Sequence, residues 1–414
     1  MARAPRIVVF SSLWPSPAQP AAGIFVRERM FRVAKRLPLV VVSPAPWFPF
    51  QALLRWWRPH FRPATPRHEV QGGIEIFRPR FLSVPGLLKR FDGVLMALGA
   101  RGTLVQLRRD DRLDVLDAHF GYPDGYAATL LGKWLRVPAT ITLRGTESRH
   151  ARTAPIRRRL TIAFARASRI FAVAGALKDV AVALGVSGEK VAVVGNGVDV
   201  DKFRPLPIEE ARRELGLAAE AKVLISVGGL TERKGFHRVI DCLPALREQF
   251  PDVLLLVVGG PGPEGDWGAR LRAQVATLGL GRSVHFLGAL PAEQLRVPLS
   301  ASDAFVLATS NEGWANVFLE AMACGLPVVT TRVGGNAEVV SRPDLGVLVP
   351  FGDQQALTVA LREALQRTWD RAAIRAYAEA NAWDGRIEVL VAEFSRLAPA
   401  PAFEPVAATD ANRA

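Results

Sequence analysis

Short apolar runs alternate with longer stretches of helical pattern along most of the 414-residue chain. In the first half the runs are RIVVF (6–10), LVVVS (39–43), VLDAH (115–119), ATITL (139–143) and RIFAV (169–173). In the second half they are KVLISVG (222–228), VLLLVVGG (253–260), VHFLG (284–288), AFVLATS (304–310) and LPVVTT (326–331). Apolar strands separated by amphipathic helices are typical of βα units and parallel sheets. One such helix is predicted as a single element over FHRVIDCLPALREQF, 236–250.

The two halves of the chain are built alike. Each opens with a strand, a Gly-bearing loop and a helix, in VVFSSLWPSPAQPAAGIFVRERM and in LISVGGLTERKGFHRVI. We therefore expect an α/β fold of two doubly wound, Rossmann-like domains that face one another across a cleft at the carboxyl ends of their strands. The turn-rich stretch VVGNGVDVDKFRPLP is the predicted hinge. The predicted limits are 1–200 for the N-terminal domain, 201–383 for the C-terminal domain, 384–397 for a helix that packs back toward the N-terminal domain and 398–414 for a disordered tail.

Bulk features argue against several classes of protein. No run reaches the roughly 18 uninterrupted apolar residues of a membrane-spanning helix. The first apolar run is too short for the core of a signal peptide. Cys242 and Cys324 lie in apolar surroundings without the spacing of metal ligands, so a disulfide between them is not expected. These features predict a cytoplasmic chain.

The net charge of +14 is unevenly distributed. Residues 1–160 contain 27 Lys and Arg against 10 Asp and Glu, whereas the rest of the chain contains 26 against 29. Such asymmetry indicates an anionic partner, either nucleic acid or a membrane surface, unless a GC-rich genome has simply favoured arginine. FPFQALLRWWRPHFRP (48–63) mixes Trp56, Trp57 and phenylalanines with arginines, which suits single-stranded nucleic acid or lipid headgroups. The alternative is that this stretch and FLSVPGLLKRFDGVLMALGARG (81–102) are core or lid helices.

The loop VGGLTERKGFH is a candidate phosphate site. Gly228 and Gly229 end a strand and allow the backbone to approach a ligand closely. Arg233 and Lys234 follow, just before a helix whose N-terminus favours anions. The arrangement favours a diphosphate ligand, and a solvated surface turn with two ordinary cations is the alternative.

The stretch SNEGWANVFLEAMACGLPVV carries two glutamates eight positions apart, Glu312 in a turn and Glu320 in a predicted helix. The segment Ala315, Asn316, Val317 and Phe318 would begin that helix and offer free N–H groups to a phosphate. A glycosidase pair is not favoured, because eight residues of helix rise about 12 Å whereas paired glycosidase carboxylates lie about 5 to 9.5 Å apart. The spacing favours divided roles, with Glu320 placed to bind a ribose diol and Glu312 pointing from its loop into the cleft.

Three polar side chains of the first half are further candidates for the cleft. His119, in DAHFGYPDG, follows a strand, and a structural histidine is the alternative. Asp124 and Glu147 are acidic candidates for which helix capping is the alternative.

Seven segments occur along the chain in a fixed order: PAAGIFVRE, DAHFGYPDG, ITLRGTE, VGNGVD, VGGLTERKG, EGWANVFLE and EAMACGLPVVTTRVGGNAEVV. Together they resemble glycosyltransferase family 4, in the branch that builds exopolysaccharide and teichuronic-type polymers. The most specific match is the spacing of Glu312 and Glu320 with Asn316 between them. The resemblance implies the GT-B fold and retaining transfer of a hexosyl group from a nucleotide diphosphate sugar, by default a UDP-sugar. It also implies a lipid-linked or polysaccharide acceptor and a role in cell-surface or exopolysaccharide biosynthesis.

The same resemblance implies residue roles. The N-terminal domain would bind the acceptor and the C-terminal domain the nucleotide sugar. Arg233 and Lys234 would neutralise the leaving diphosphate, Glu320 would bind the ribose, and Glu312 would touch the hydroxyls of the transferred sugar. Gly23, at the N-terminus of the first helix, would close over the phosphates. No cofactor and no metal are implied, because cations and helix N-termini take that role.

The chain departs from the family pattern at two places. Many relatives carry Arg where this chain has Gly229, and Arg233 here stands beside Lys234 instead. Many also carry His-Gly-Thr or His-Gly-Ser where this chain has Arg144-Gly145-Thr146. Arg144 can still meet a sugar or phosphate oxygen, but a proton-shuttling histidine at that position is excluded. In this fold the departing phosphate is thought to accept the acceptor's proton, so activity does not require that histidine.

A lipid-diphosphate acceptor is anionic and lies at a membrane surface, so the resemblance favours an anionic membrane over nucleic acid as the partner of the basic first half. The expected location is the cytoplasm, with peripheral attachment to the inner face of the cell membrane. Two alternatives remain open at this point. One is a nucleotide-sugar epimerase on the same fold, and the other is a non-catalytic basic adaptor for membranes or nucleic acid.

Overall fold

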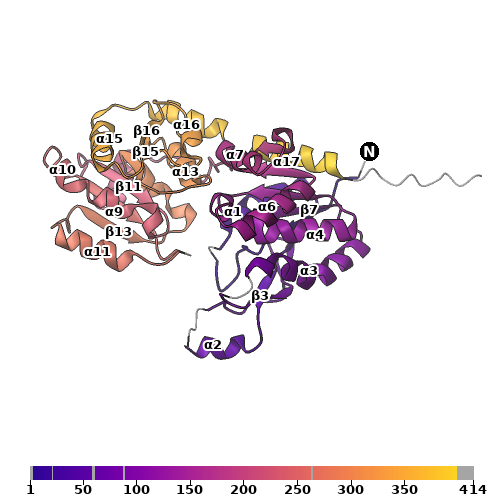
Figure 1. Cartoon of the computed structure of the whole chain (residues 1–414). Coiled ribbons are helices and arrows are strands. Elements are labelled where there is room, and N and C mark those ends of the chain that lie inside the picture. The colour runs from indigo at the N-terminus through magenta and orange to yellow at the C-terminus, as the bar shows by residue number, and fades with distance from the viewer. Residues whose placement is uncertain (1–2, 21, 58–60, 87–88, 263, 399–414) are drawn as a thin grey trace, which may run out of the picture. The chain divides into compact units, whose positions relative to one another are not determined.

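The structure is a computed structural model of the chain, and it describes all residues except 1–2, 21, 58–60, 87–88, 263 and 399–414. The described chain contains two large β-sheets, and helices connect their strands (Figure 1). Within the described ranges, no helix is long and apolar enough to cross a membrane. The tail predicted to be disordered, 398–414, lies outside the described residues from position 399 onward.

An eight-stranded sheet contains all five strands predicted in the first half of the chain. Its order is β10 (Val191–Val193), β9 (Arg169–Ala172), β8 (Ala139–Leu143), β7 (Val115–His119), β1 (Ile7–Phe10), β2 (Leu39–Val42), β5 (Ile74–Phe77) and β4 (His68–Gln71). Strand β1 pairs in parallel with both β7 and β2, and the edge strand β4 runs antiparallel to β5. Every residue of β1 is buried, as expected for a strand of a parallel sheet that is covered on both faces.

A six-stranded sheet contains all five strands predicted in the second half. Its order is β13 (Val284–Gly288), β12 (Leu254–Val258), β11 (Val223–Val227), β14 (Ala304–Leu307), β15 (Val328–Thr331) and β16 (Gly346–Val349). All of its pairs are parallel. Chain order runs outward from β11 in one direction and from β14 in the other, which is the order of a Rossmann fold.

The structure also contains strands that sequence reasoning missed. They are β4, β5, β10, β16 and the two strands of a separate small sheet, β3 (Ala45–Trp47) and β6 (Arg80–Leu82). Each is only three or four residues long, and several carry polar side chains at alternate positions. Such short segments give a weak periodic signal, because a strand pattern needs several alternations to stand out.

Helices connect the strands in both halves. Those before position 200 are α1 (Ile24–Ala34), α2 (Gln51–Trp57), α3 (Asp92–Arg109), α4 (Tyr126–Leu135), α5 (Glu147–His150), α6 (Ala154–Arg166) and α7 (Gly175–Ala183). Those after it are α8 (Ile208–Glu214), α9 (Phe236–Ile240), α10 (Leu243–Arg247), α11 (Gly268–Thr277), α12 (Arg296–Ser300), α13 (Asn316–Ala323), α14 (Asn336–Val339), α15 (Gln354–Gln366), α16 (Arg371–Ala380) and α17 (Trp383–Leu397). Short single-turn segments are η1 (Lys89–Phe91), η2 (Gly121–Gly125), η3 (Gly188–Lys190), η4 (Glu232–Lys234) and η5 (Ala292–Gln294).

The prediction of one continuous helix over 236–250 is wrong. The structure has two short helices there, α9 and α10, separated at Asp241 and Cys242. Pro244 lies in the first turn of α10. Proline has no N–H to continue the hydrogen-bond ladder and its ring clashes with the carbonyl one turn earlier, so the chain ends one helix and starts another. Both helices still bury their apolar faces, which is the pattern that suggested a single helix.

Residue contacts divide the chain into two compact units. The first unit is Met1–Ile141, Ala165–Arg169 and Leu390–Ala414, and the second is Thr142–Phe164 and Ile170–Val389. The predicted domain limits stay a prediction.

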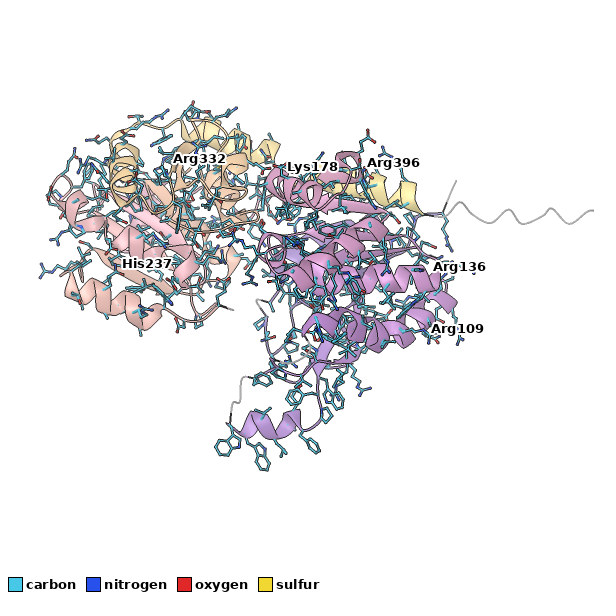
Figure 2. The ribbon with its side chains drawn as sticks, viewed as in Figure 1. Arg109, Arg136, Lys178, His237, Arg332 and Arg396 are labelled. Atoms are coloured by element: carbon cyan, nitrogen blue, oxygen red, sulfur yellow. The ribbon has the colours of Figure 1, made fainter. Side chains whose placement is uncertain are left out.

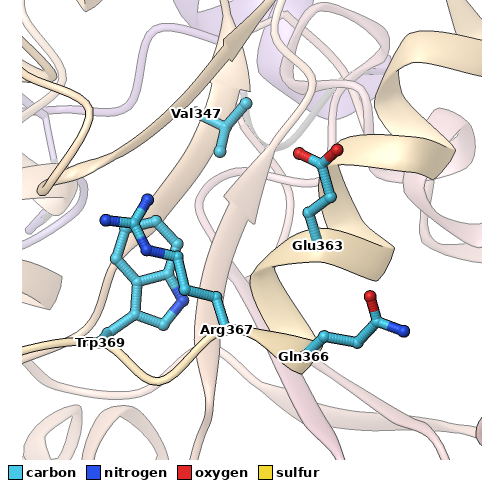
Figure 3. Close-up of a pocket in the computed structure, with 5 residues that line it drawn as sticks. All are labelled: Val347, Glu363, Gln366, Arg367 and Trp369. Atoms are coloured by element: carbon cyan, nitrogen blue, oxygen red, sulfur yellow. The ribbon is translucent and has the colours of Figure 1, made fainter.

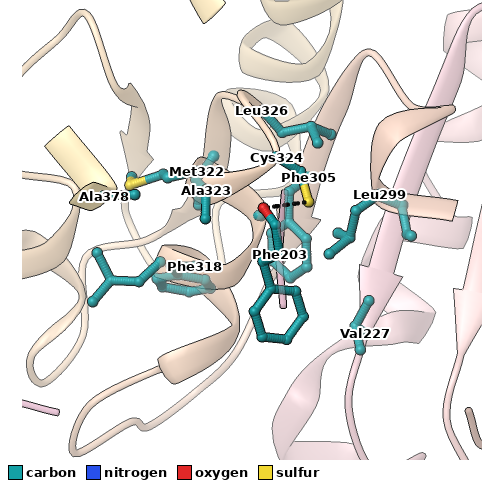
Figure 4. Packing of buried hydrophobic residues seen from close by; sticks show 14 of the residues in the cluster. Phe203, Val227, Leu299, Phe305, Phe318, Met322, Ala323, Cys324, Leu326 and Ala378 are labelled. Atoms are coloured by element: carbon teal, nitrogen blue, oxygen red, sulfur yellow. Dashed lines mark hydrogen bonds between the residues drawn. The ribbon is translucent and has the colours of Figure 1, made fainter. Parts of the chain in front are cut away.

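The core of the second unit fixes the helix that follows β14. Phe318 of α13 packs against Phe305 of β14, with ring centroids 5.7 Å apart in an edge-to-face arrangement (Figure 4). Beyond the C-terminus of α13, Cys324 Sγ lies 3.5 Å from the carbonyl oxygen of Phe203. Cys324 and Cys242 are both buried and free in the structure. Helix α13 is therefore held by the core along its buried side, and its N-terminus is kept in a fixed place.

Candidate functional site

The loops with the predicted donor residues meet at one point of the six-stranded sheet. Strands β11 and β14 are neighbours, and the sheet order reverses between them. Such a switch point leaves a crevice outside the carboxyl ends of the strands, where ligands bind in open α/β sheets. The loop after β11 carries Arg233 and Lys234 in η4, and the loop after β14 carries Glu312. The two loops are joined directly, since the Ser310 N–H donates to the Arg233 carbonyl at 2.8 Å.

Two cations converge on one carboxylate at this point. Lys234 Nζ donates to Glu312 Oε1 at 2.7 Å, and Arg233 Nη1 donates to the same oxygen at 3.0 Å. Arg233 also donates to the Asn311 carbonyl at 2.8 Å and to Glu264 Oε2 at 2.8 Å. The structure thus brings the three predicted catalytic residues into one hydrogen-bonded cluster.

The cluster holds Glu312 as a buried anion. The Glu312 side chain is 9% exposed, whereas that of Arg233 is 31% exposed. Burial raises the pKa of Glu312, but the charges of Lys234 and Arg233 outweigh this effect and leave the pKa below its ordinary value. A carboxylate that stays ionised in this place cannot act as a general acid near neutral pH. Its chemistry is that of an acceptor of hydrogen bonds.

The loop after β15 braces Glu312 from behind. The Gly335 N–H donates to the Glu312 carbonyl at 3.2 Å. Gly334 has a φ of +50°, and a Cβ on it would lie 1.8 Å from the same carbonyl oxygen. Only glycine allows this close approach, because any other residue would need both the strained backbone and the occupied space. Thr309 Oγ1 adds a contact of 3.2 Å to Glu312 Oε1.

Helix α13 begins at Asn316, one residue after the first residue of the predicted starting segment, Ala315. Its N-cap residue, Ala315, supplies no side-chain hydrogen bond to the first turn. Val317 is half-buried and Phe318 is buried in the core, and the Phe318 N–H already donates to the Ala315 carbonyl at 3.1 Å. The predicted phosphate contacts of these two residues stay a prediction. Glu320 lies on the second turn of the helix and is half-buried. Its predicted contact with a ribose stays a prediction.

Four buried polar atoms on or beside these loops have no hydrogen-bond partner among the described residues, namely His237 Nδ1, Trp314 Nε1 and two side-chain oxygens. Thr231 Oγ1 is one of these oxygens, three positions before Lys234 and two after Gly229. Asn336 Oδ1 is the other oxygen, although the amide nitrogen of Asn336 donates to the Thr331 carbonyl at 2.9 Å. Buried polar atoms normally have partners, so unpaired ones beside a crevice indicate where a ligand or water binds.

Arg144 and Glu147 lie in the same contact unit as these loops. Glu147 is fully buried, and its Oε2 accepts from the backbone N–H of Arg144 at 3.1 Å and of Gly145 at 2.8 Å. These two bonds hold the turn before α5 and are not a helix cap, since the donors lie outside the helix and its N-cap residue, Thr146, makes no side-chain cap hydrogen bond. Arg144 Nη1 donates to Asn196 Oδ1 at 3.2 Å, and Asn196 Nδ2 donates to Asn316 Oδ1 at 2.9 Å. A hydrogen-bonded chain therefore connects Arg144 to the start of α13.

His119 is the last residue of β7 and is fully buried. Its Nε2 lies 3.3 Å from Asp117 Oδ2, and the Thr140 hydroxyl donates to the other oxygen of Asp117 at 2.6 Å. Burial raises the pKa of Asp117, but its interactions with His119, Thr140 and Arg29 together outweigh this effect and leave that pKa below its ordinary value. The environment is that of a structural histidine, the alternative that the sequence left open, and a role for His119 in the cleft stays a prediction.

The first unit has its own switch point, between β1 and β7. Asp124, which follows β7, accepts hydrogen bonds from the backbone N–H and from the hydroxyl of Ser12, which follows β1. Burial raises the pKa of Asp124 to about 7. Gly23 is the N-cap residue of α1, with a φ of +69°, and a Cβ there would lie 2.3 Å from the Leu13 carbonyl oxygen. The sequence placed Gly23 correctly at the start of the first helix.

Sequence reasoning missed two residues of the cluster around Glu312, Glu264 and Thr309, and also Asn336, which begins α14 after the neighbouring loop that follows β15. Glu264 lies in an exposed loop and pairs with Arg233 through space alone, so no local pattern marks it. Thr309 follows β14 and was counted as part of that strand. Asn336 stands inside the segment TRVGGNAEVV, whose Gly-Gly turn was the only available signal.

A pocket of the second unit lies apart from this site. This pocket, of about 360 Å³, is lined by Val347, Glu363, Gln366, Arg367 and Trp369 (Figure 3). These residues come from β16 and from the C-terminal end of α15 and the turn after it. A helix that follows a parallel strand runs back antiparallel to it, so the end of α15 lies toward the amino ends of the strands. Among the described residues, no group of three or more His, Cys, Asp or Glu is arranged to hold a metal ion.

Two family models match the chain. Residues 207–381 match the model described as Glycosyl transferases group 1, and residues 59–202 match the model described as Glycosyltransferase Family 4. The first match contains the entire cluster around Glu312, and the second contains His119, Arg144 and Glu147.

Relatives and solved structures resemble the chain over different lengths. The glycosyltransferase TuaC of Bacillus subtilis (strain 168), named for teichuronic acid biosynthesis, is 28% identical over 375 residues, which cover 87% of this chain and 88% of that protein. The D-inositol 3-phosphate glycosyltransferase of Corynebacterium urealyticum is 36% identical over 222 residues, or 51% of this chain and 52% of that protein. The crystal structure of Anabaena HepE in complex with UDP superposes with a TM-score of 0.72 at 22% identity, covering 94% of this chain and 99% of that chain.

Proposed function

The chain belongs to glycosyltransferase family 4 and has the GT-B fold, with two Rossmann-like domains, and on that premise we propose that it transfers a sugar from a nucleotide diphosphate sugar to an acceptor alcohol with retention of configuration. The proposed donor is a UDP-sugar, and UDP bound to the similar protein HepE supports this choice. The proposed acceptor is a lipid-linked or polysaccharide glycan, supported by the similarity to TuaC, which is named for teichuronic acid biosynthesis.

One observation carries the proposal, namely the meeting of Lys234, Arg233 and Glu312 at the switch point of the six-stranded sheet. A leaving diphosphate gains negative charge as the sugar bond breaks, so cations fixed beside it stabilise the transition state more than the ground state. Lys234 and Arg233 supply that charge without a metal ion or other cofactor in the proposed mechanism. The nearby carboxylate of Glu312 accepts hydrogen bonds from the hydroxyls of the transferred sugar.

The proposed proton transfer follows from the residues at position 144 and around it. Arg144 cannot serve as a general base, because a guanidinium has no acceptor lone pair and stays protonated. The departing diphosphate therefore takes the proton of the acceptor hydroxyl in this proposal. Arg144 remains in reach of the start of α13 through Asn196, where it can stabilise a sugar or phosphate oxygen.

A binding panel tests the donor assignment before any acceptor is known. The free energy of unfolding is measured by thermal shift with UDP, GDP and ADP and with their sugars, where a ligand at 100 times its Kd adds about 2.7 kcal/mol. A shift with one nucleotide family supports the proposal and identifies the base. The same panel on Lys234→Ala should show a much smaller thermal shift. An unchanged shift would show that the diphosphate does not bind at this loop.

The cellular setting is also part of the proposal. A cytoplasmic enzyme attached to the inner face of the cell membrane would meet both a nucleotide sugar and a lipid-linked acceptor. The two free, buried cysteines are compatible with a reducing compartment.

A further inference from the structure

The first unit presents large apolar side chains to solvent on and around α2. Phe50, Leu53, Trp56 and Trp57 have exposed fractions of 79%, 52%, 82% and 88%. These four residues are called the aromatic surface below. Burial of these tryptophans in the protein core, one of the alternatives from the sequence, is therefore wrong. In contrast, α3, which covers most of the second stretch, does bury residues such as Met96 and Ala100 in the core.

The aromatic surface is held in place on one side only. Gln51, the first residue of α2, is buried, and its amide nitrogen donates to the Arg62 carbonyl at 3.4 Å. The preceding strand β3 pairs in parallel with β6, and the Ser83 N–H donates to the Trp47 carbonyl at 2.8 Å. The body of the first unit therefore anchors the base of α2, while its remaining faces carry exposed apolar side chains. Figure 1 shows α2 beyond β3 and apart from the other labelled helices of the first half.

Positive charge accompanies this surface along the sequence. Residues 47–91 contain eight Lys and Arg against two Glu. Arg80, on β6, and Lys89 and Arg90, in η1, are exposed, and Lys89 pairs with Asp92 at 3.1 Å. Both glutamates of the segment are already paired, Glu69 with Arg78 and Glu75 with Arg112. The apolar side chains are thus accompanied by cations whose charge nearby carboxylates only partly balance.

We propose that the aromatic surface and its flanking cations dock on an anionic lipid bilayer, with Trp56 and Trp57 at the headgroup level. Tryptophan combines an apolar ring with a polar N–H and is enriched at that level, and cations beside it attract anionic headgroups. A single strand of nucleic acid fits less well, because the leucines of α2 cannot stack on bases as aromatic rings do. With seven residues, α2 is far too short to span a bilayer, so the attachment is shallow and reversible.

This inference extends the proposed function, since a lipid-linked acceptor lies at such a surface, but its test needs no catalysis. Full-length chain is mixed with phosphatidylcholine vesicles, with or without phosphatidylglycerol, and the bound fraction is measured by flotation at low and high salt. The expected result is binding to the anionic vesicles that weakens at high salt, as the Debye length falls from about 10 Å at 0.1 M to about 3 Å at 1 M. Absence of binding to anionic vesicles at low salt would overturn the inference, whatever the outcome of the nucleotide panel.

Matched variants separate the two components of the surface. Trp56→Ala/Trp57→Ala should lower the bound fraction about tenfold or more, because the interfacial anchors are lost. The control is Trp134→Ala, which removes a tryptophan that is 41% exposed elsewhere in the first unit. Equal binding by the two variants would overturn the assignment to α2.

For the charges, Arg80→Glu/Arg90→Glu should weaken binding about tenfold or more, and the control is Arg109→Glu/Arg136→Glu. Arg109 and Arg136 are exposed at the ends of α3 and α4 and are labelled in Figure 2. If both pairs weaken binding equally, the attraction is a property of the whole charged unit and not of this surface.

A second copy of the chain is the other possible occupant of an apolar surface. Sedimentation velocity of the parent and of Trp56→Ala/Trp57→Ala, without vesicles, distinguishes the two. A parent dimer that the variant abolishes would overturn the membrane assignment. All variants should keep the parent's thermal unfolding midpoint, because the substituted side chains are exposed.

Discussion

Glu312 neutralises two cations that the proposed reaction needs for the leaving diphosphate. Its Oε1 accepts from Lys234 at 2.7 Å and from Arg233 at 3.0 Å. A nucleotide diphosphate carries more negative charge than one carboxylate, so we expect a bound donor to draw these cations toward itself. Glu312 would then have free acceptor capacity for the hydroxyls of the sugar. We therefore expect two states of this cluster. Glu312 is paired with the two cations when no donor is bound, and it contacts the hydroxyls of the sugar when the donor is bound.

The first prediction at this scale concerns Lys234. Lys234→Ala should lower kcat/KM for the nucleotide sugar by an amount that corresponds to about 2–4 kcal/mol, because a charge that stabilises the leaving group is lost. Steady-state kinetics measure this effect. Lys202→Ala, which removes only a partly exposed ion pair with Glu293, is the matched control. Activity of Lys234→Ala within twofold of the control would contradict the assignment.

The second prediction separates the two glutamates. Glu320→Gln should mainly raise KM, since a ribose contact is the same in the ground state and the transition state. Glu312→Gln should mainly lower kcat, because its partner is the sugar whose bond is breaking. Kinetics of both variants with one donor make the comparison, and opposite effects would mean that the two roles are exchanged. Glu312→Gln should also lower the free energy of unfolding by about 1–3 kcal/mol, because two buried charge-assisted hydrogen bonds are weakened.

The third prediction concerns the pH dependence that Asp124 confers. Its folded pKa of about 7 lies above the value of about 3.9 for an unfolded aspartate. Between these pH values the folded chain binds a proton that the unfolded chain has released, so this group makes stability fall as pH rises toward 7 and adds no further change above it. The slope is at most about 1.4 kcal/mol per pH unit.

Asp124→Asn should remove this contribution, since asparagine can keep both contacts to Ser12 and does not titrate. Urea unfolding of parent and variant from pH 4 to pH 8 measures the difference, with the exposed Asp110→Asn as control. A difference between parent and Asp124→Asn that is constant over this range would show that Asp124 is ionised throughout.

At the scale of elements, the approach of the loop after β15 to the loop after β14 positions the site. Gly334→Ala should destabilise the chain, because it combines a left-handed backbone with a clash against the Glu312 carbonyl. Gly279→Ala is a matched control, since its φ of +63° is similar and a Cβ there meets nothing within 4 Å. The control should lose about 1–2 kcal/mol of unfolding free energy from backbone strain.

Gly334→Ala should lose at least about 2 kcal/mol more than this control, since a buried clash adds to the strain. It should also lose nucleotide binding, because Glu312 and its cations move with the displaced loop. Urea unfolding and the nucleotide thermal shift measure the two effects. Equal destabilisation by Gly334→Ala and Gly279→Ala would contradict this prediction, because it would show that the two loops can move apart without loss of unfolding free energy.

At the scale of the whole molecule, thiol reactivity reports on the integrity of the fold. Burial raises the pKa of Cys242 to about 11 and that of Cys324 to about 12. The thiolate is the reactive form, so the native chain should react very slowly with Ellman's reagent at pH 8, and two thiols should appear on unfolding in urea. Rapid reaction of one thiol before unfolding would reveal local opening around that residue.

Much of the architecture is encoded by neighbouring residues along the chain and could therefore be predicted from the sequence. All ten predicted strands are present, because a buried parallel strand is a continuous apolar run that needs no distant residue to identify it. The start of α13 at Asn316 was likewise predictable to within one residue from its own neighbours. The break between α9 and α10 was also present locally, in Pro244, but the apolar periodicity on both sides of it concealed the break.

Only the tertiary structure decides which distant residues meet and which apolar side chains stay exposed. Lys234 and Glu312 are 78 positions apart, and they pair because the order of the six-stranded sheet makes β11 and β14 neighbours. Glu264 joins them with no local pattern at all. Trp56 and Trp57 are large aromatic residues, for which a place in the core was one alternative. They are exposed because no other part of the described first unit covers α2. Burial is a property of the surface that packs against a side chain, and a sequence does not contain that surface until the chain has folded.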